Sequence, residues 1–259
     1  MKKINIVLSF DDGLIDFKEN ALPVLERFGI KGTINIVSGF LDGSINNGYV
    51  HLTIDDIKMI KQMGHEIAVH SNSHTKNSTI EDFILCRNKL NKIFGDDSYG
   101  VVIPYSRIVP KQLVKDFRES GFLYLCDYGK KECRKPLYAK IARVIYHFYR
   151  NKHFRIFLDG YSYVYNRSDF NKFFPCFFRL PASRDNRPKD IIRFLKKVKN
   201  DSYIVIMLHS IINDKDTACE WPYGAWTIDE FNYFLSVLTK KKGIRFFTQK
   251  GMIDYAKSV

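Results

Sequence analysis

Short apolar runs alternate with amphipathic stretches along almost the whole chain, and turn residues separate them. The runs predict strands buried on both faces, whereas apolar residues recurring every three or four positions predict helices. Strands are predicted at residues 4–10, 33–37, 65–70, 100–103, 122–126, 177–180, 203–208 and 243–247. Alternating strands and helices indicate a mostly parallel α/β sheet. At 259 residues, this pattern favours a closed or nearly closed (β/α) barrel over an open doubly wound sheet.

Capping residues mark where several of the predicted helices begin. Thr53 can cap a helix by accepting a hydrogen bond from a backbone N–H of the first turn. Ser78 with Glu81, and Thr227 with Glu230, have the spacing of a capping box, in which each side chain satisfies a backbone N–H of the other residue. We therefore expect helices to start at these three places.

Residues 130–172 interrupt the alternation and carry eleven Lys or Arg, three acidic residues and ten Tyr or Phe. We interpret them as an insertion between two barrel strands, within a single domain that spans residues 1–259. Pro136 can begin a helix with an apolar stripe and a basic side. Such a helix is typical of proteins that bind a membrane surface, and equally of helices that pack on their own domain.

The composition, with 45% hydrophobic and 27% charged residues, is that of a globular protein and excludes disordered and collagen-like chains. No apolar run reaches the ~20 residues that a membrane-spanning helix needs. The apolar run at residues 4–8 is too short for a signal peptide, so we expect a cytoplasmic protein. The five cysteines are odd in number and form no Cys-x-x-Cys pair, which argues against a disulfide framework or a zinc ribbon.

The chain has 41 Lys and Arg against 28 Asp and Glu, a net charge of +13. Residues 130–172 contribute +8 of this charge, and the remaining residues contribute +5. Positive charge attracts nucleic acids, anionic membranes and phosphorylated substrates. Because no nucleic-acid-binding motif accompanies the charge, we expect no nucleic-acid partner. We interpret the basic insertion as a local binding surface for phosphate groups or for a membrane.

Polar residues with ligand or acid-base chemistry lie at the ends of several predicted strands: Asp11, Asp12, His70, Asp127, Arg179 and His209. In a (β/α) barrel the carboxyl ends of the strands form the face that holds the active site, so this pattern predicts an enzyme. Asp11 and Asp12 repel each other unless a cation is close, and a metal ion would leave one of them free as a base. The simpler alternative is an Asp-Gly turn that leads into a helix.

His70 and His74 are four residues apart, which brings both imidazoles to one side of a helical turn or tight loop. With an aspartate from another strand end they would form a His-His-Asp set with room for water, as in catalytic zinc sites. His209 follows a strongly apolar strand at the same face. A single histidine in that position is also common as a hydrogen-bonded structural residue.

Four motifs occur in order along the chain: Ser-Phe-Asp-Asp-Gly at 9–13, His-Ser-Asn-Ser-His at 70–74, Ile-Pro-Tyr at 103–105 and Leu-His at 208–209. In order and approximate spacing they resemble the polysaccharide deacetylase family, also called the NodB homology domain or carbohydrate esterase family 4, over about residues 4–250. The resemblance implies a distorted (β/α)7 barrel that removes N- or O-acetyl groups from sugar polymers. It also implies one divalent metal ion as cofactor, most often Zn²⁺, with Co²⁺, Ni²⁺ or Fe²⁺ as alternatives.

The resemblance assigns a role to each residue of the first two motifs that can bind a metal or a proton. Asp12, His70 and His74 would hold the metal ion and leave a position open for water. Asp11 would be the general base that takes a proton from that water.

The last two motifs would complete the catalytic residues. The backbone N–H of Tyr105, held in place by Pro104, would stabilise the oxyanion. His209 would protonate the departing amine. Leu208 would line the pocket for the acetyl methyl group.

The sequence departs from the family at Val102, where an arginine usually lies two residues before the proline and tethers the catalytic aspartate. Arg179 or Arg107 could supply the missing cation, although Arg179 could instead form a surface ion pair. The motif that usually contains an aspartate and a nearby tryptophan is not clear. Asp127 is only a positional candidate for orienting His209.

Trp221 and Trp226 follow His209, where they could stack on sugar rings or close the barrel mouth as a hydrophobic lid. A cytoplasmic deacetylase meets precursors rather than exported polymers. We therefore expect the substrate to be an acetylated amino sugar of surface-polysaccharide biosynthesis, lipid-linked or nucleotide-linked, whose phosphates the basic insertion attracts. The insertion would also allow peripheral contact with the inner face of the membrane.

Two other interpretations remain open. One keeps the metal site but changes the bond, since relatives of this family also hydrolyse other non-peptide C–N bonds in formyl groups or small cyclic amides. The other is a non-catalytic glycan-binding relative, which Val102 makes credible.

Overall fold

The computed structural model describes residues 2–46, 48–95, 97, 99–106, 109–127, 163–170, 174–183, 186–213 and 225–259. Within these residues the main sheet follows the order β10-β11-β1-β2-β5-β6-β7-β9. Its strands are β1 (Ile4–Phe10), β2 (Thr33–Ile36), β5 (Glu66–Val69), β6 (Val101–Val102), β7 (Leu125–Cys126), β9 (Cys176–Phe177), β10 (Leu180–Pro181) and β11 (Ser202–Leu208).

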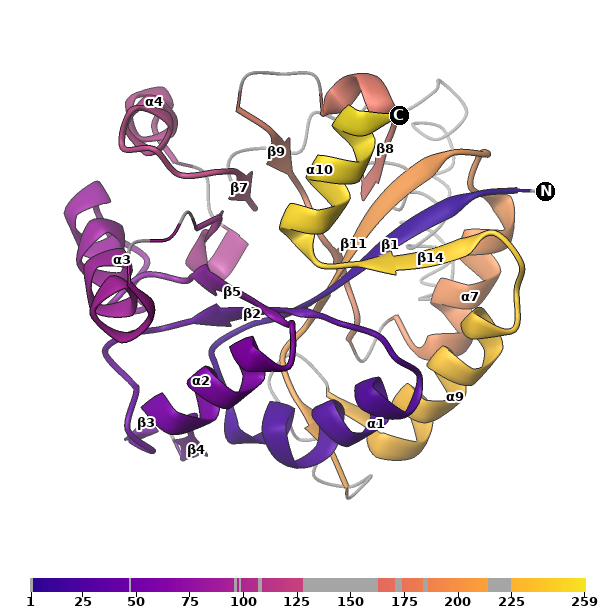
Figure 1. Cartoon of the computed structure of the whole chain (residues 1–259), viewed down its shortest axis with the longest axis horizontal. Helices are drawn as coiled ribbons and strands as arrows, with labels where there is room; N and C mark the ends of the chain where they lie inside the picture. Colours follow the sequence, from indigo (N-terminus) through magenta and orange to yellow (C-terminus); the bar gives the residue numbers. More distant parts are fainter. Residues whose placement is uncertain are drawn as a thin grey trace, which may run out of the picture.

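All neighbours along this path pair in parallel, as the sequence pattern predicts. β14 (Ile244–Phe247) also pairs in parallel with β1, whereas β8 (Val164–Tyr165) pairs antiparallel with β11. The two edge strands, β9 and β10, are separated in the chain only by Phe178 and Arg179. The sheet therefore curls until its edges meet, and the barrel-like α/β fold is confirmed (Figure 1).

Helices surround the curled sheet (Figure 1). They are a π-helical turn (Phe17–Ala21) continuing into α1 (Leu22–Arg27), then α2 (Ile54–Gln62), α3 (Ile80–Phe94), α4 (Lys111–Glu119), α7 (Pro188–Lys197), α9 (Ile228–Thr239) and α10 (Gln249–Ser258). The predicted caps at Thr53 and Thr227 are confirmed, each as a complete capping box. The box predicted at Ser78 is wrong, because the Ser78 hydroxyl bonds the carbonyl of Thr75 and α3 begins after Thr79.

Side chains on the two faces of the strands belong to two separate hydrophobic clusters. On β1, Ile4, Ile6, Leu8 and Phe10 pack in the large cluster between sheet and helices, whereas Val7 belongs to a second cluster inside the barrel. The residues that share the face of Val7, among them Ser9 and Asp11, therefore point into the barrel.

The amino-terminal end of the barrel is closed by α10. The backbone N–H of Gln249 bonds Thr33 and that of Lys250 bonds Glu66, and these two partners are the first residues of their strands. Met252 of α10 is fully buried in the inner cluster. A site inside this barrel must consequently open at the carboxyl ends of the strands.

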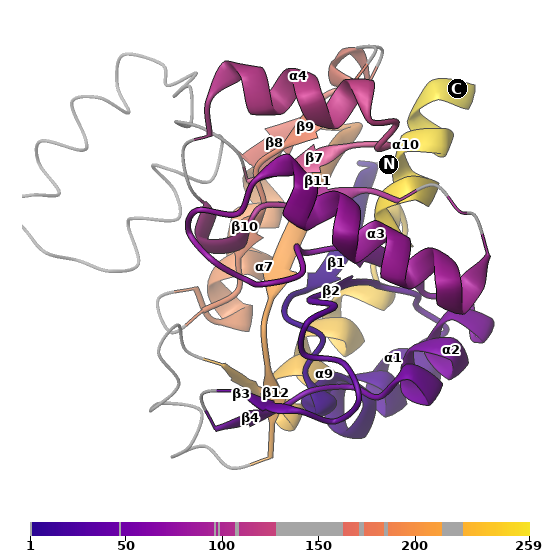
Figure 2. The ribbon, with the colours of Figure 1, turned by 90° about the vertical axis from the view of Figure 1, so that its left-hand side faces the viewer.

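Two small two-stranded sheets were not expected from the pattern. β3 (Ile45–Asn46) and β4 (Tyr49–Val50) form a hairpin, and β12 (Ile211–Ile212) pairs in parallel with β13 (Trp226–Thr227). Tyr49 packs on Leu14, Ile212 and Ala225, which places the hairpin beside β12 (Figure 2). The strand predicted at 177–180 is divided in two, because the N–H of Arg179 bonds the carboxylate of Asp127 instead of a neighbouring strand.

The insertion predicted at 130–172 lies between β7 and β9, and the structure describes only its residues 163–170. These pack on the barrel, since β8 pairs with β11 and Phe170 is fully buried in the inner cluster. The helix predicted after Pro136 lies outside the described residues. Among the described residues, no helix combines the length and the apolar character needed to cross a membrane.

Candidate active site

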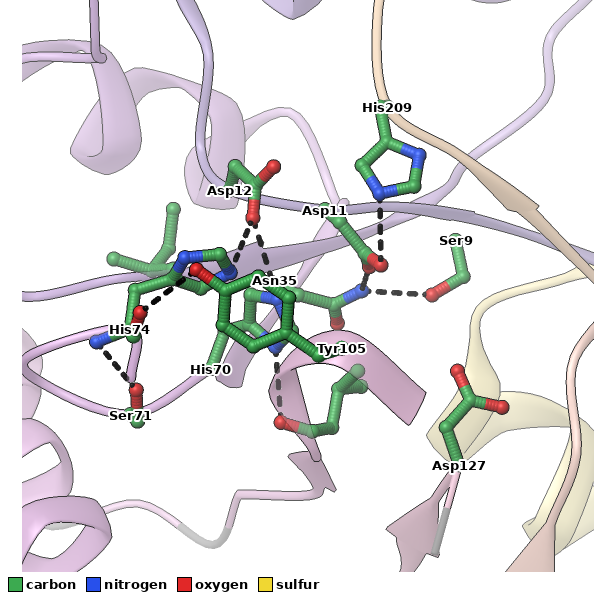
Figure 3. Close-up of polar contacts among 12 residues, drawn as sticks. Ser9, Asp11, Asp12, Asn35, His70, Ser71, His74, Tyr105, Asp127 and His209 are labelled. Atoms are coloured by element: carbon green, nitrogen blue, oxygen red, sulfur yellow. Dashed lines mark hydrogen bonds and ion pairs between the residues drawn. The ribbon is translucent and has the colours of Figure 1, made fainter. Parts of the chain in front are cut away.

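Asp12, His70 and His74 come together at the carboxyl ends of β1 and β5 (Figure 3). Asp12 Oδ1 lies 3.3 Å from Nε2 of His70 and 3.1 Å from Nε2 of His74. One ligand atom from each residue lies within 4.8 Å of the other two, a spacing at which one metal ion can contact all three. The histidines lie in a tight loop rather than on a helix.

The imidazole of His70 is oriented by the backbone. Its Nδ1 lies 2.9 Å from the carbonyl oxygen of Val102. Because a carbonyl only accepts hydrogen bonds, Nδ1 carries a proton, and Nε2 on the Asp12 side is the ring atom left to bind a metal ion. Val102, the position of the family's arginine, thus contributes its backbone here, while its side chain is buried inside the barrel.

Local backbone geometry aims these ligands. Asp12, Ser71 and His74 have φ values of 71°, 69° and 49°, a left-handed conformation that costs a non-glycine residue about 1–3 kcal/mol. The Ser71 hydroxyl accepts a hydrogen bond of 2.9 Å from the N–H of His74, which holds the loop in its turn. A Cβ atom at Gly39 would lie 2.3 Å from the carbonyl oxygen of Asn72, so only glycine lets the neighbouring loop pack this closely.

The charges around Asp12 suit a divalent cation. Burial would raise the pKa of Asp12, but His70 and His74 hold it well below its usual range. Burial would lower the pKa of His70, but Asp11 and Asp12 raise it. Asp12 Oδ1 is buried and makes no hydrogen bond, although it faces two imidazole nitrogens. A metal ion would satisfy all three atoms and displace any proton from His70, so the residues fit a catalytic zinc-type site.

Asp11 points into the barrel beside this group and is held by two donors. Arg179 donates from Nη1 to Asp11 Oδ1 at 2.5 Å and from Nη2 to Oδ2 at 2.8 Å. Asn35 Nδ2 donates to Oδ1 at 2.6 Å, and both donors also bond the hydroxyl of Ser9 (Figure 3 for Asn35). Arg179 further binds Asp127 through Nε at 2.7 Å.

Arg179 therefore lies where a cation can hold the carboxylate of Asp11. Its side chain is 1% exposed, so the alternative of a surface ion pair is wrong. Arg107, the other candidate, lies outside the described residues. Burial would raise the pKa of Asp11, but Arg179, His70 and His209 lower it. Asp11 is consequently ionised at neutral pH and can accept a proton.

His209 follows β11 and lies across from the metal ligands. Its Nε2 is 3.9 Å from Asp11 Oδ2 (Figure 3). Asp127, the positional candidate for orienting His209, bonds Arg179 with both of its carboxylate oxygens. The segment after His209 is held instead by the turn before α1: Ser210 donates to the carboxylate of Asp16, and Asn20 donates to the carbonyl of Ile211 at 2.7 Å.

Tyr105 lies next to the metal ligands in the turn after β6. Its backbone has a φ of 61°, its ring centroid is 4.9 Å from that of His74, and its hydroxyl lies 3.3 Å from the His74 carbonyl oxygen. Pro104 is buried and Tyr105 is 47% exposed. The structure thus brings this turn to the site, while the part of its N–H in oxyanion stabilisation stays a prediction.

Two predicted substrate contacts are not at the surface. Leu208 is 1% exposed in the core between sheet and helices, and its contact with an acetyl group stays a prediction. Trp226 is also 1% exposed, packs edge-on against Phe234 and donates from Nε1 to the Asn186 carbonyl at 3.2 Å. Stacking of a sugar on Trp226 is therefore wrong, because neither ring face is free. Trp221 lies outside the described residues.

Sequence reasoning missed Asn35 and His51. Asn35 lies in a strand whose four residues are all buried, and an amide at such a position signals a polar partner inside the fold. The Nδ1 atom of His51 lies 2.9 Å from the carbonyl oxygen of Asp12, and burial lowers the pKa of His51. No local pattern in the sequence indicates that contact.

The comparisons with known proteins include the residues of this site. Residues 1–125, which include both aspartates and both loop histidines, match the model of the polysaccharide deacetylase family. The match covers 125 of the 259 residues, and this N-terminal part of the chain resembles the polysaccharide deacetylase family. The chain is also 35% identical over 69 residues to YxkH of Bacillus subtilis (strain 168), whose name assigns it to that family. This match covers 27% of the chain and only 23% of YxkH.

Two solved structures resemble this chain in fold over nearly its whole length. The Xyl-CE4 domain of a multidomain xylanase from the hindgut metagenome of Trinervitermes trinervoides has a TM-score of 0.54 at 16% identity, over 100% of this chain and 93% of that one. The peptidoglycan deacetylase PdaC of Bacillus subtilis has a TM-score of 0.52 at 15% identity, over 99% and 92%. At these identities the likeness shows a shared fold.

Proposed function

We propose that this protein is a metal-dependent hydrolase that removes an acetyl group from the nitrogen, or the oxygen, of a sugar. The observation that carries the proposal is the position of Asp11: a buried, ionised carboxylate held by Arg179 directly beside the Asp12, His70 and His74 group. The match of residues 1–125 to the polysaccharide deacetylase family model supports this chemistry.

When bound by Asp12, His70 and His74, a divalent ion, with Zn²⁺ favoured by the His-His-Asp set, supplies a Lewis acid that polarises the acyl carbonyl and acidifies a water. Asp11 accepts the proton of the attacking water. Arg179 and Asn35 keep its oxygens in place, so that orientation is not lost when the proton arrives.

The remaining steps use the other side of the site. The backbone N–H of Tyr105 donates to the oxygen on which negative charge develops. His209, 3.9 Å from Asp11, donates a proton to the leaving nitrogen. Acetate and the free amine are the products.

We further propose that the substrate is an acetamido sugar of a phosphorylated precursor, nucleotide-linked or carried on a polyprenyl diphosphate, handled in the cytoplasm or at the inner membrane face. The net charge of +8 in residues 130–172 supports this choice, because Lys and Arg attract phosphate. Surface-polysaccharide assembly is the process that consumes such products.

Metal content and acetate release test the proposal together. We expect the purified protein to contain about one divalent ion and to release acetate from at least one acetylated hexosamine, offered as nucleotide-linked, lipid-linked or oligosaccharide forms. Asp11→Asn should keep the metal and lose turnover. Formyl and cyclic-amide substrates are the comparison, and release from these alone would assign a different C–N bond. A metal-free protein that releases acetate from none of them would overturn the proposal.

A further inference from the structure

The loop that carries Asp12 is bound along its length by the segment that follows the β3–β4 hairpin. The N–H of Leu52 donates to the carbonyl of Gly13 at 2.8 Å, and Leu14 forms a β-bridge with His51. Between these contacts, His51 Nδ1 lies 2.9 Å from the carbonyl oxygen of Asp12. Two segments far apart in the sequence thus meet at a metal ligand.

His51 is itself held firmly. It is 4% exposed, and its ring centroid lies 4.9 Å from that of Phe40. Its backbone N–H donates to the carbonyl of Ser44 at 3.1 Å. Since a carbonyl oxygen only accepts hydrogen bonds, His51 Nδ1 is the donor toward Asp12. The ring therefore offers one directed donor from a fixed position.

Asp12 needs a hydrogen-bond partner because its backbone has a left-handed conformation. Asp12 and Gly13 have consecutive φ values of 71° and 63°. Glycine adopts this left-handed conformation freely, but aspartate does so only when its surroundings enforce it. The conformation of Asp12 determines where its Cβ points, and so whether Oδ1 reaches His70 and His74 (Figure 3).

We propose that His51 is a positioning residue for the metal site: its Nδ1–H bond to the Asp12 carbonyl holds Asp12 in the conformation that aims its carboxylate at His70 and His74. The inference rests on the proposed metal-dependent function. His51 does not touch the ion or the substrate in this role. It acts through Asp12 alone.

Two amide variants test whether a hydrogen-bond donor at the position of Nδ1 is sufficient without the imidazole ring. Asparagine places its amide nitrogen near the position of imidazole Nδ1, whereas glutamine places it near Nε2. His51→Asn should therefore keep metal affinity close to that of the wild type, while His51→Gln should weaken the Kd for Zn²⁺ and Co²⁺ by about 10- to 100-fold, as is usual when a residue supporting a ligand is lost. Affinity is measured by competition with a chromogenic chelator, and the visible spectrum of the Co²⁺ form reports the ligand geometry.

A matched control is His65, another buried histidine, whose Nδ1 accepts from the N–H of Gly32. His65→Gln should lower the unfolding temperature without changing metal affinity. Circular dichroism of each metal-free variant verifies folding, and His51→Ala replaces the glutamine variant if that one does not fold. If His51→Gln bound metal as tightly as the wild type, or if His51→Asn lost as much affinity as His51→Gln, the inference about His51 would be overturned. The proposed function would not be affected by either result. A wild type that binds no metal would overturn the proposed function together with the inference about His51.

Discussion

The guanidinium of Arg179 binds both carboxylate oxygens of Asp11, at 2.5 and 2.8 Å, although the two residues are 168 positions apart. The same side chain binds Asp127, and all three residues are 3% exposed. One buried cation thus serves two buried carboxylates. It comes from the short link between β9 and β10, and in strand order only β7 lies between β9 and β6, the strand that carries Val102.

Substitution of Arg179 should destabilise the fold and raise the pKa of Asp11. Arg179→Met would leave two buried carboxylates without a cation, which costs about 3–5 kcal/mol in the free energy of unfolding. Arg179→Lys keeps a charge but cannot bind both oxygens in a planar fork. Because Arg179 lowers the pKa of Asp11, we expect the acidic limb of kcat/KM to move to higher pH in the lysine variant.

The pH profile of folded Arg179→Lys and urea denaturation of Arg179→Met measure these effects. Arg187→Lys is the control, since Arg187 pairs with Glu230 on the helices outside the barrel. An acidic limb that stays in place in Arg179→Lys would show that Arg179 does not set the state of Asp11.

Replacement of His209 should distinguish amide from ester substrates. His209→Ala should lower kcat for an acetamido sugar by about 10²–10⁴, the usual contribution of a general acid. Nitrophenyl acetate has a leaving group that needs no proton, so its hydrolysis should change little. Metal affinity should be unaffected, because His209 is not among the three grouped ligands. Equal losses on both substrates would argue against proton donation by His209.

The raised pKa of Asp16 predicts that the stability of the fold depends on pH. Burial, with a contribution from Glu19, raises the pKa of Asp16 from 3.8 to about 6. Between these values the folded state binds more protons than the unfolded state, so the stabilisation present below pH 3.8 is lost as the pH rises through about 6. Asp16→Asn should therefore flatten the slope of unfolding free energy against pH in that window.

Urea denaturation of the metal-free protein at several pH values between 4 and 7 tests this slope, with the difference between wild type and variant isolating Asp16. Asp55→Asn, at a carboxylate whose side chain is 92% exposed, is the control. Parallel curves for wild type and Asp16→Asn would contradict the raised pKa.

Trp226 should matter for folding rather than for substrate. Trp226→Phe removes a fully packed indole and its hydrogen bond to Asn186, so we expect a loss of about 1–3 kcal/mol in unfolding free energy. KM for an acetylated sugar should remain unchanged. Unchanged stability with a several-fold higher KM would restore the sugar-stacking interpretation.

The local pattern of the chain was sufficient for much of the fold and for the face of the site. Buried apolar runs report strands because side-chain burial repeats over a few residues, and polar residues directly after them must lie at one end of a parallel sheet. Asp11, Asp12, His70 and His209 were found in this way. The spacing of His70 and His74 was enough to pair them, because both lie in one short loop.

What required the tertiary structure was the choice of partner for each buried polar group. Arg179 could have faced solvent, and only closure of the barrel places it against Asp11 and Asp127. His51 and Asn35 carry no local signal, since their hydrogen bonds join segments that the sequence separates. Trp226 changed from a surface prediction to a core residue for the same reason. Hydrophobic periodicity is local and can be read along the chain, whereas hydrogen-bond pairing in a buried site depends on which strands become neighbours.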